Sequence, residues 1–393
     1  MFMNSKLLEI SIVGAGIGGL VAALALKKRG HKPIIYEKTE SLSELGAGIQ
    51  LSPNASKVLE YLGVMEELQA DVYEPDAFQF VHYRTGKVLA QRALKNSSVR
   101  IYGSPNYDVH RADLQKALLK IINREEIQIE TNSEIIDLYE EANGAFIRTK
   151  DRVIGSDAVI AADGIHSIVR KKLWGEDQAR YTGNVAWRML VPIEKISSQF
   201  LQQNTKVWLG PKKHFVQYLV KGGNFLNCVC LVEQNDWTNE DWSEKGDISE
   251  LKHIFSDWHP EIQEILESTK SGSLYKWGLH DRAPMNKWSK GRFSLLGDAA
   301  HPMLPFVAQG AAMAIEDGIV LASSLSAFEN VELGLNDYED KRMNRTAKAQ
   351  RTATRNATIF HLSDFFAFFR NLVMKFFIKK IMDSFYKYDA ISK

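Results

Sequence analysis

The sequence predicts an α/β protein in which a nucleotide-binding domain built from βαβ units and a mixed sheet encloses an inserted antiparallel sheet. Strand, glycine turn, helix and strand follow one another over residues 7–36, an order that favours parallel pairing. Between 181 and 233 the apolar residues alternate with a period of two, as in antiparallel strands. Buried-type strands then end in Asp-Gly near 163 and in Gly-Asp near 297.

Length and composition limit the function classes. The chain has 393 residues, and about 150 residues per domain is a usual prior, so two or three domains are expected. Forty-nine basic and 48 acidic residues leave a net charge of +1, which gives no reason to expect nucleic acid as a partner. A hydrophobic content of 45% with 25% charged residues excludes global disorder and a coiled coil.

The two cysteines and the chain start bear on localisation. Cys228 and Cys230 are two residues apart in an alternating segment, a poor geometry for a mutual disulfide. A four-cysteine zinc site is not available, and no other metal site is expected. The early apolar run leads into a glycine turn rather than a cleavage site, so we expect no signal peptide and a reducing, cytoplasmic location. The most apolar late segment, 365–385, is interrupted by basic residues and is not expected to span a bilayer.

The pattern along the chain predicts the elements of the first domain. They are a strand at Leu7–Val13, a helix at Leu20–Arg29 closed by Gly30, a strand at Pro33–Tyr36, a loop at Gly46–Pro53, helices at Asn54–Leu62 and from His110 to about Ile122, a hairpin around Asn143-Gly144, and a strand at Ala158–Ala162.

The later elements follow in the same way. They are strands at Val207–Leu209, His214–Val220 and Leu226–Val232, a mainly helical stretch at Trp237–Thr269, a strand at Arg292–Leu296, a helix at Gln309–Ser326, and two further helical stretches. We therefore expect a Rossmann-like domain in two parts, 1–180 and 281–335. It would enclose a substrate domain at 181–280 and be followed by C-terminal helices at 336–393.

The first glycine turn has the G-x-G-x-x-G spacing of a dinucleotide site. Gly14 would allow the tight turn, Gly16 would let a pyrophosphate approach the backbone, and Gly19 would let the helix pack on the strand. The helix N-terminus would then present unpaired N–H groups to the phosphates. The motif alone is weak evidence, but a strand precedes it and a helix follows it.

Glu37 follows Gly19 by 18 residues, at the end of the second strand. A carboxylate at that place accepts the ribose hydroxyls of an adenosine and repels a 2′-phosphate, so the ligand would be FAD or NAD. The alternative is a glycine-rich turn with an unrelated surface Glu37.

Two later motifs favour FAD over NAD. Asp163-Gly164 and Gly297-Asp298 each follow a buried strand, and an NAD domain alone would need neither. The long ribityl chain of FAD needs acceptors along an extended path. No second strand–G-x-G-x-x-G–helix pattern occurs, so NADH or NADPH, if it is the reductant, has no Rossmann domain of its own.

These motifs together resemble one known family, the class A FAD-dependent aromatic hydroxylases of the p-hydroxybenzoate hydroxylase type. Five motifs occur in the family's order between Ser11 and Asp389, and the last is most similar to those of salicylate hydroxylases, 3-hydroxybenzoate 6-hydroxylases and 6-hydroxynicotinate 3-monooxygenases. The segments are IVGAGIGGLVAALALKKRG, GAGIQLSPNA, HRADLQKAL, AADGIHSIVR and LLGDAAHPMLPFVAQGAAMAIEDG.

The resemblance implies roles for individual residues. Ala15 would join the three glycines at the pyrophosphate, Arg111 would approach the phosphate and ribityl region, and Asp298 would bind the ribityl chain. Asp163 would lie between FAD and a nicotinamide donor. Lys38 and Gly48 complete the cofactor-binding set that the resemblance implies.

The helix that begins near Gln309 suits a flavin ring. Gly310, Ala311 and Ala312 are small, so the backbone can approach a flat ring with its N–H groups at a positive dipole end. These groups would stabilise the negative charge of reduced flavin. The alternative is a small-residue helix start that serves packing only.

The substrate side is predicted from one strand. His214, Val216, Tyr218 and Val220 share a face. His214 would accept a phenolic proton, because imidazole titrates near neutrality, and Tyr218 would hold the ring or relay the proton. The alternative is an ordinary core strand.

Other candidates for the substrate pocket stay open. His301 would face substrate or stabilise its loop, which Pro302 and Pro305 stiffen. Gln50 is a further pocket candidate. Three arginines are alternatives for binding a substrate carboxylate: Arg84, Arg188 and Arg282.

The reaction implied is hydroxylation of a small aromatic or heteroaromatic, phenolic acid-like substrate with NAD(P)H and O₂, through a C4a-hydroperoxyflavin. The alternatives are a larger substrate (an antibiotic, polyketide, isoprenoid or quinone precursor) and a flavin-binding protein without turnover.

The C-terminal segment has two interpretations. Its basic stretch and the aromatic residues from Phe365 to Phe385 suit weak attachment to a membrane surface. They also suit helices that cover the domain junction or a dimer face, which we favour, so a monomer or a homodimer is expected. The basic residues are Arg342, Arg345, Lys348, Arg351 and Arg355.

Overall fold

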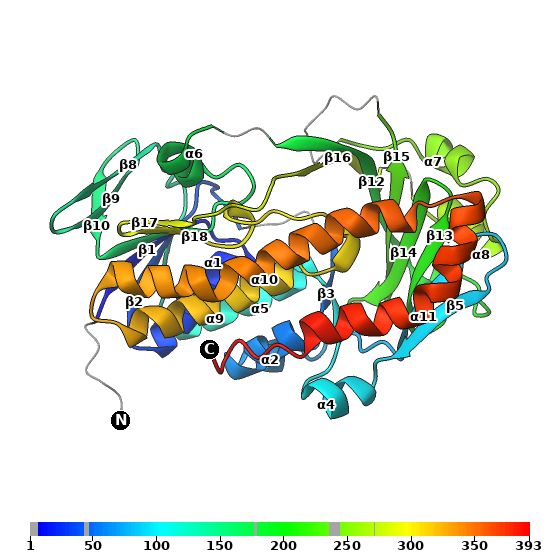
Figure 1. Ribbon diagram of the computed structural model, residues 1–393, viewed down its shortest axis with the longest axis horizontal. Helices are drawn as coiled ribbons and strands as arrows, with labels where there is room; N and C mark the ends of the chain where they lie inside the picture. The colour runs from blue at the N-terminus through cyan, green and yellow to red at the C-terminus, as the bar shows by residue number, and fades with distance from the viewer. Residues whose placement is uncertain (1–6, 43–46, 177–178, 236–243, 271) are drawn as a thin grey trace.

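The computed structural model describes residues 7–42, 47–176, 179–235, 244–270 and 272–393 (Figure 1). A parallel sheet lies at one end of the long axis and a larger, mainly antiparallel sheet at the other. The long helix α10 (Val331–Phe360) runs along both, and the predicted fold class is confirmed.

The parallel sheet has six strands, and only its edge pair β17–β18 is antiparallel. Their order is β17 (Ser289–Lys290), β18 (Phe293–Leu295), β11 (Ala158–Ala161), β1 (Glu9–Val13), β2 (Lys32–Tyr36) and β7 (Gln128–Glu130). The apolar helix α1 (Ile17–Lys28) contacts both α5 (Arg111–Arg124) and α9 (Gly310–Ala327). The interior strands are mainly apolar because helices and loops bury both faces of a parallel sheet.

Four functional turns meet at one edge of this sheet. Gly14 follows β1, Glu37 follows β2, Asp163 follows β11 and Gly297-Asp298 follows β18. These strands are parallel and adjacent, so their carboxyl ends lie side by side. Ligands of open α/β sheets bind outside this edge.

The second sheet has seven strands. Their order is β16 (Tyr275–Asp281), β12 (Arg180–Pro192), β15 (Phe225–Glu233), β14 (Lys213–Val220), β13 (Asn204–Gly210), β4 (Ala77–His82) and β5 (Val88–Ala93). The predicted meander is confirmed by the antiparallel pairs β13–β14, β14–β15 and β12–β15.

Two strands of this sheet come from earlier in the chain than expected. β4 pairs in parallel with β13, and β5 continues the sheet beyond it, so the predicted division at residue 180 divides the sheet. A parallel pair with so long a connection leaves no local signal, because its partner strands are more than 100 residues apart.

The two faces of this sheet differ in what covers them. One face carries Trp187, Phe215 and the two cysteines beneath α7 (Ile248–Ile254) and α8 (Pro260–Glu267). Cys228 and Cys230 are buried free thiols. The other face carries His214, Val216 and Tyr218, and it turns toward the loop that precedes α9, toward α10 and toward α11 (Asp364–Tyr386).

One predicted loop is a strand. Residues 48–51 of the expected loop Gly46–Pro53 form β3 (Gly48–Leu51), which pairs with β6 (Tyr107–His110). The glycines indicated a loop because the strand that pairs with this segment lies nearly 60 residues away and leaves no local signal. Gly46 lies outside the described residues. Of the helical stretch Trp237–Thr269, residues 237–243 also lie outside them.

The remaining elements are short. They are α2 (Pro53–Tyr61), α3 (Val64–Leu68), α4 (Ser97–Tyr102), α6 (Ile168–Trp174), the small sheet of β8 (Asp137–Glu141), β9 (Gly144–Arg148) and β10 (Val153–Ser156), and 3₁₀ turns at Ile193–Lys195, Gly297–Ala299 and Pro305–Val307. Among the described helices, none combines the length and the apolar character needed to cross a membrane.

Candidate functional site

The three glycines of the first turn have three different surroundings. Gly14 has φ of +103°, and a Cβ there would lie 2.5 Å from the Ala162 carbonyl oxygen. A Cβ at Gly19 would lie 2.1 Å from the Gly14 oxygen, whereas nothing lies within 4 Å of one at Gly16. Backbone atoms therefore leave no room for a side chain at Gly14 and Gly19. Space remains at Gly16, where the sequence predicts a pyrophosphate.

Glu37 reaches back to this turn. Its Oε2 accepts the N–H of Ala15 at 2.9 Å, and its Oε1 accepts the N–H and O–H of Thr39, each at 3.0 Å. The carboxylate is thus held beside the glycine turn with acceptor capacity left for hydroxyl groups. The adjacent Lys38 is exposed.

Asp163 has one carboxylate oxygen occupied and one without a partner. Oδ2 accepts the N–H of Ile168 at 2.8 Å at the start of α6, while Oδ1 is buried and makes no hydrogen bond. Burial raises the pKa of this carboxyl above its usual range. A buried acceptor without a donor costs free energy, so the site suits a ligand that donates to it.

Asp298 is exposed although both of its neighbours are buried. Protein atoms surround it closely enough to raise the pKa of its carboxyl, while His301 and Arg111 act to lower that pKa. Arg111, the first residue of α5, is therefore an electrostatic neighbour of Asp298. The pair combines an accessible carboxylate with a nearby cation.

The start of α9 is held by a buried polar network. Ala308 has φ of +51°, and Gly310 and Ala311 follow it, half-buried. The Gln309 amide donates to Ser52 Oγ at 2.9 Å and accepts from Asn54 at 3.1 Å. These bonds fix the position of the helix terminus that the sequence assigns to the flavin ring.

Deeper in α9, two acidic residues form a fully buried ion cluster. Arg342 donates to Glu316 at 2.6 Å and to Asp317 at 2.7 Å, and Arg345 also pairs with Glu316. Burial alone would raise the pKa of Asp317, but the neighbouring His301 and Arg342 hold it below its usual value. Two residues of the basic stretch thus act inside the protein.

His301 belongs to the same cluster. Its Nε2 lies 2.6 Å from Asp317 Oδ2, which also accepts the Gly297 N–H at 3.1 Å. The side chain is buried and its ring packs on Trp288. Of its two predicted alternatives, this geometry matches stabilisation of the loop rather than contact with substrate.

His214 lies in an aromatic cage. Its ring contacts Phe306 of the loop before α9 and Phe360 of α10, and 2% of its surface is exposed. Its Nδ1 lies 2.8 Å from Nε2 of His361, whose Nδ1 lies 3.1 Å from Oε1 of Glu233. The Glu233 side chain is 42% exposed, so this chain of groups leads from the cage to solvent.

The pKa shifts along this chain have clear causes. Burial holds the pKa of His214 well below its usual value, and the neighbouring His361 and Arg370 act in the same direction. The hydrogen bond from His361 lowers the pKa of Glu233. His214 is therefore neutral and Glu233 ionised at neutral pH.

Tyr218 lies further along the same face, where the seven-stranded sheet approaches the pair of strands β3 and β6. A Cβ at Gly48 would be 2.7 Å from the Tyr218 hydroxyl, and the Gly48 N–H donates to Asn227 at 2.8 Å. Position 48 needs glycine because β3 approaches β14 closely. The sequence analysis assigned Gly48 to the cofactor and did not predict this contact.

Asp108 is a candidate that sequence reasoning missed. It is buried on β6 and accepts from Thr205 at 2.9 Å and from Gln50 at 3.3 Å. Burial raises the pKa of its carboxyl to about 7, and its charge raises that of Tyr218. Titratable groups with such shifts concentrate at functional sites. A lone Asp in a short strand gave no signal before its partners were known.

The three candidate arginines lie in different places. Arg84 pairs with Asp257 at 2.8 Å on the surface, and Arg282 donates to the Ile165 carbonyl. Arg188 stacks on Trp277 at 5.3 Å, and its charge partly opposes the rise that burial and Asp108 cause in the pKa of Tyr218. Only Arg188 of the three shares the sheet face of His214 and Tyr218.

A groove of about 680 Å³ lies where α10 passes the end of β16. Arg282 connects it to Ile165 of the Asp163 loop. Gln350 connects it to Pro302 of the loop after β18. Its charged residues, four basic and one acidic, are Arg180, Asp281, Arg282, Arg351 and Arg355.

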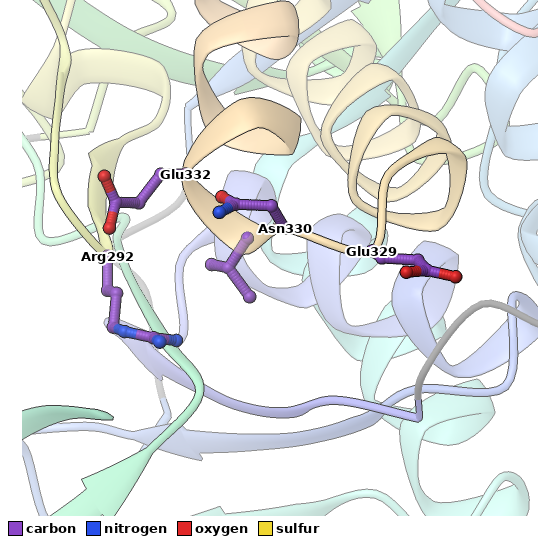
Figure 2. Close-up of a pocket in the computed structure, with 5 residues that line it drawn as sticks. Arg292, Glu329, Asn330 and Glu332 are labelled. Carbon is purple, nitrogen blue, oxygen red and sulfur yellow. The ribbon is translucent and has the colours of Figure 1, made fainter. Parts of the chain in front are cut away.

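A smaller pocket of about 290 Å³ lies at the start of α10 (Figure 2). Arg292 and Glu332 line it and lie on the same side of the view, with Glu329 on the other. Arg292 precedes β18, so this pocket is at the amino edge of the parallel sheet, away from Gly14 and Asp163. It is not part of the candidate site.

Comparison with known proteins agrees with this geometry. The model of the FAD binding domain family matches residues 8–353. The chain is 35% identical over 354 residues to the 6-hydroxynicotinate 3-monooxygenase of Pseudomonas fluorescens, covering 88% of this chain and 91% of that protein. It is 34% identical to 3-hydroxybenzoate 6-hydroxylase 1 of Aquipseudomonas alcaligenes, covering 93% of each. The chain belongs to the FAD-dependent aromatic hydroxylases.

A solved structure extends the likeness to the whole fold. HpxO of Klebsiella pneumoniae, complexed with FAD and uric acid, superposes with a TM-score of 0.87 over 98% of each chain at 26% identity. The family assignment and the FAD cofactor predicted from sequence are confirmed.

The residues present fit FAD in this hydroxylase. The open backbone at Gly16, the buried and unpartnered Oδ1 of Asp163, and the accessible Asp298 lie at one edge of the parallel sheet. Each is a feature that a bound dinucleotide would complete.

Proposed function

We propose that this chain hydroxylates a small aromatic or heteroaromatic ring that carries an ionisable hydroxyl group, with NADH or NADPH as reductant. The observation that carries the proposal is the chain of groups from His214 through His361 to Glu233, on the sheet face turned toward the loop before α9. Bound FAD, once reduced, supplies the activation of O₂, and the protein supplies position and proton handling.

The proton path follows from the hydrogen bonds. The ionised Glu233 can only accept, so His361 donates to it through Nδ1, and in that tautomer His361 presents a lone pair on Nε2. His214 then donates to it through Nδ1, which leaves His214 Nε2 as a proton acceptor. Removal of the phenolic proton makes the ring more nucleophilic.

The apolar cage around this base excludes water. Phe306 and Phe360 contact the His214 ring, and Phe306 lies in the loop just before the α9 terminus. A dry site protects the activated oxygen from reaction with water. We assign Arg188, beside Tyr218, to an acidic substituent of the substrate.

The experiment that tests the proposal is flavin reduction by NADH and by NADPH, measured with a panel of hydroxylated aromatic acids. We expect at least one compound to speed reduction and to yield a product with one added oxygen, detected by mass spectrometry. Fast reduction without any substrate, or no response across the panel, would favour a larger substrate or a flavoprotein without turnover.

The arginine-rich groove supports the approach of the reductant. It combines an excess of positive charge with connections to the Asp163 loop and to Pro302. Guanidinium groups suit phosphate recognition, and NAD(P)H, without a Rossmann domain of its own, carries a pyrophosphate.

A substitution at Gly16 separates cofactor binding from folding. Alanine fits there in the protein, since nothing lies within 4 Å of its Cβ and the backbone, at φ −70°, is ordinary. We expect Gly16→Ala to leave thermal unfolding of the apoprotein unchanged and to weaken FAD binding about 10- to 100-fold, or ~1.4–2.8 kcal/mol. FAD titration by fluorescence quenching measures the affinity.

Gly19→Ala is the contrasting variant, because its Cβ would collide with the Gly14 oxygen even without cofactor. It should lower the stability of the apoprotein itself. If Gly16→Ala bound FAD as tightly as the unmodified chain, the pyrophosphate would not lie at this turn.

A further inference from the structure

The outer face of α11 is apolar and uncovered. Phe376 is 81% exposed and Phe365 68%, values that belong to a surface rather than a core. Aromatic rings on this face pack edge to face on one another, as Phe365 does on Phe369 at 4.7 Å. The exposed set is Phe365, Phe366, Phe368, Phe369, Leu372, Val373 and Phe376, which we call the α11 outer face.

The opposite side of the same helix is also apolar, but it is buried. Met374, Ile378 and Met382 pack into the cluster that contains Phe306 and lies beneath the His214 face of the sheet. The inner side therefore holds the helix on the domain, and the α11 outer face remains exposed to solvent. An exposed apolar patch of this kind marks an interaction site.

Charge indicates which partner suits this face. Three exposed lysines lie beside it: Lys375, Lys379 and Lys380. No Asp or Glu occurs between residues 365 and 382. Lysines three or four positions from Leu372 and Phe376 lie on adjoining parts of the helix surface, where their stems can cover apolar surface and their ammonium groups can reach outward.

We propose that the α11 outer face binds to the surface of an anionic phospholipid bilayer, with the helix in the plane of the interface. Aromatic and aliphatic side chains beside a basic border suit the boundary between headgroups and acyl chains. A second copy of the chain suits it less, because a self-complementary contact would bring the lysines of both copies together without acidic partners. The proposal does not depend on the proposed function.

The membrane contact would have a consequence for the site. Met374 and Ile378, on the inner side of α11, share a cluster with Phe306 and Val216. One helix would then separate the bilayer surface from the wall of the candidate substrate site.

The test is flotation of the purified holoenzyme with vesicles. Vesicles of phosphatidylcholine with 30% phosphatidylglycerol are compared with vesicles of phosphatidylcholine alone. We expect clear co-flotation with the anionic vesicles, weaker binding to neutral ones, and a partial loss in 0.5 M NaCl, since salt screens only the charged part.

Two sets of variants separate the apolar and the charged contributions. Leu372→Ser with Phe376→Ser should abolish flotation with unchanged FAD content, because both side chains are exposed. Lys375, Lys379 and Lys380 replaced by Gln should weaken anionic binding on the order of 100-fold, at ~1 kcal/mol per lysine. Leu333→Ser, at another exposed leucine on α10, is the control that should float normally.

Two results would overturn the proposal. One is absence of flotation with anionic vesicles. The other is a homodimer in sedimentation analysis that Leu372→Ser with Phe376→Ser converts to monomer, which would assign the face to self-association.

Discussion

Replacing Arg342 with Met is expected to lower the free energy of unfolding by about 3–5 kcal/mol, the usual cost of breaking a buried ion pair from one side. Arg342 is fully buried and donates to both Glu316 and Asp317. Methionine fills similar space but leaves two carboxylates in the interior with Arg345 and His301 as their remaining partners. The midpoint of thermal unfolding should fall by roughly 4–6 °C, because the entropy of unfolding grows with chain length.

The same variant should also lose FAD. Asp317 holds the Gly297 N–H and His301, so its displacement would disturb the turn that presents Asp298. FAD content after purification measures this effect.

Lys341→Ala is the matched control on the same helix. Lys341 pairs with Asp337 four residues away at the surface, and such pairs contribute about 0.5 kcal/mol or less. If Arg342→Met unfolded within 2 °C of the unmodified protein, the cluster would not be a main source of stability.

The sequence is informative where structure depends on near neighbours. The βαβ unit, the meander and the glycine turn each have a short-range period or spacing, and the structure confirms these elements. The positions of Gly14, Glu37, Asp163 and Asp298 at one edge follow from the parallel order of their strands. The parallel strand order alone therefore predicts that residues up to 284 positions apart lie at the same edge, even though no individual contact between them was predicted.

The rest depends on partners distant in the sequence. His361 meets His214 across 147 residues, and Asp108 meets Thr205 across 97, so neither could be recognised before the fold was known. The sequence placed Arg342 in a basic stretch and gave no sign that it is buried, because its partners, Glu316 and Asp317, lie on another helix. On α11 both sides are apolar, and only burial separates the inner side from the exposed one.

Replacing His214 with Ala is expected to lower hydroxylation about 10²- to 10⁴-fold at neutral pH, the usual contribution of a positioned base. FAD content and flavin reduction should change less than twofold, because the proposed function places His214 on the substrate side of the site. The fraction of consumed NAD(P)H that yields product should fall. Product formation and NAD(P)H oxidation, measured together, give this ratio.

The pH profile tests the same residue. Burial holds the pKa of His214 well below 6.5, so its neutral form, which accepts the proton, persists as pH falls below that value. Activity governed by this base should therefore stay on its plateau through pH 6.5 and decline only in more acidic solution. A His253→Ala variant, which removes an exposed histidine of the same domain, should match the unmodified enzyme.

His361→Phe tests the connection to solvent. The ring would keep the aromatic packing but could not accept from His214 Nδ1, so the imidazole would lose its fixed tautomer. We expect turnover to fall roughly tenfold with the substrate KM little changed. Glu233→Gln should also lower turnover, but by a smaller factor. Full turnover and coupling in His214→Ala would instead assign proton removal to another group, with Tyr218 on that face and Asp108 of β6 as the titratable candidates.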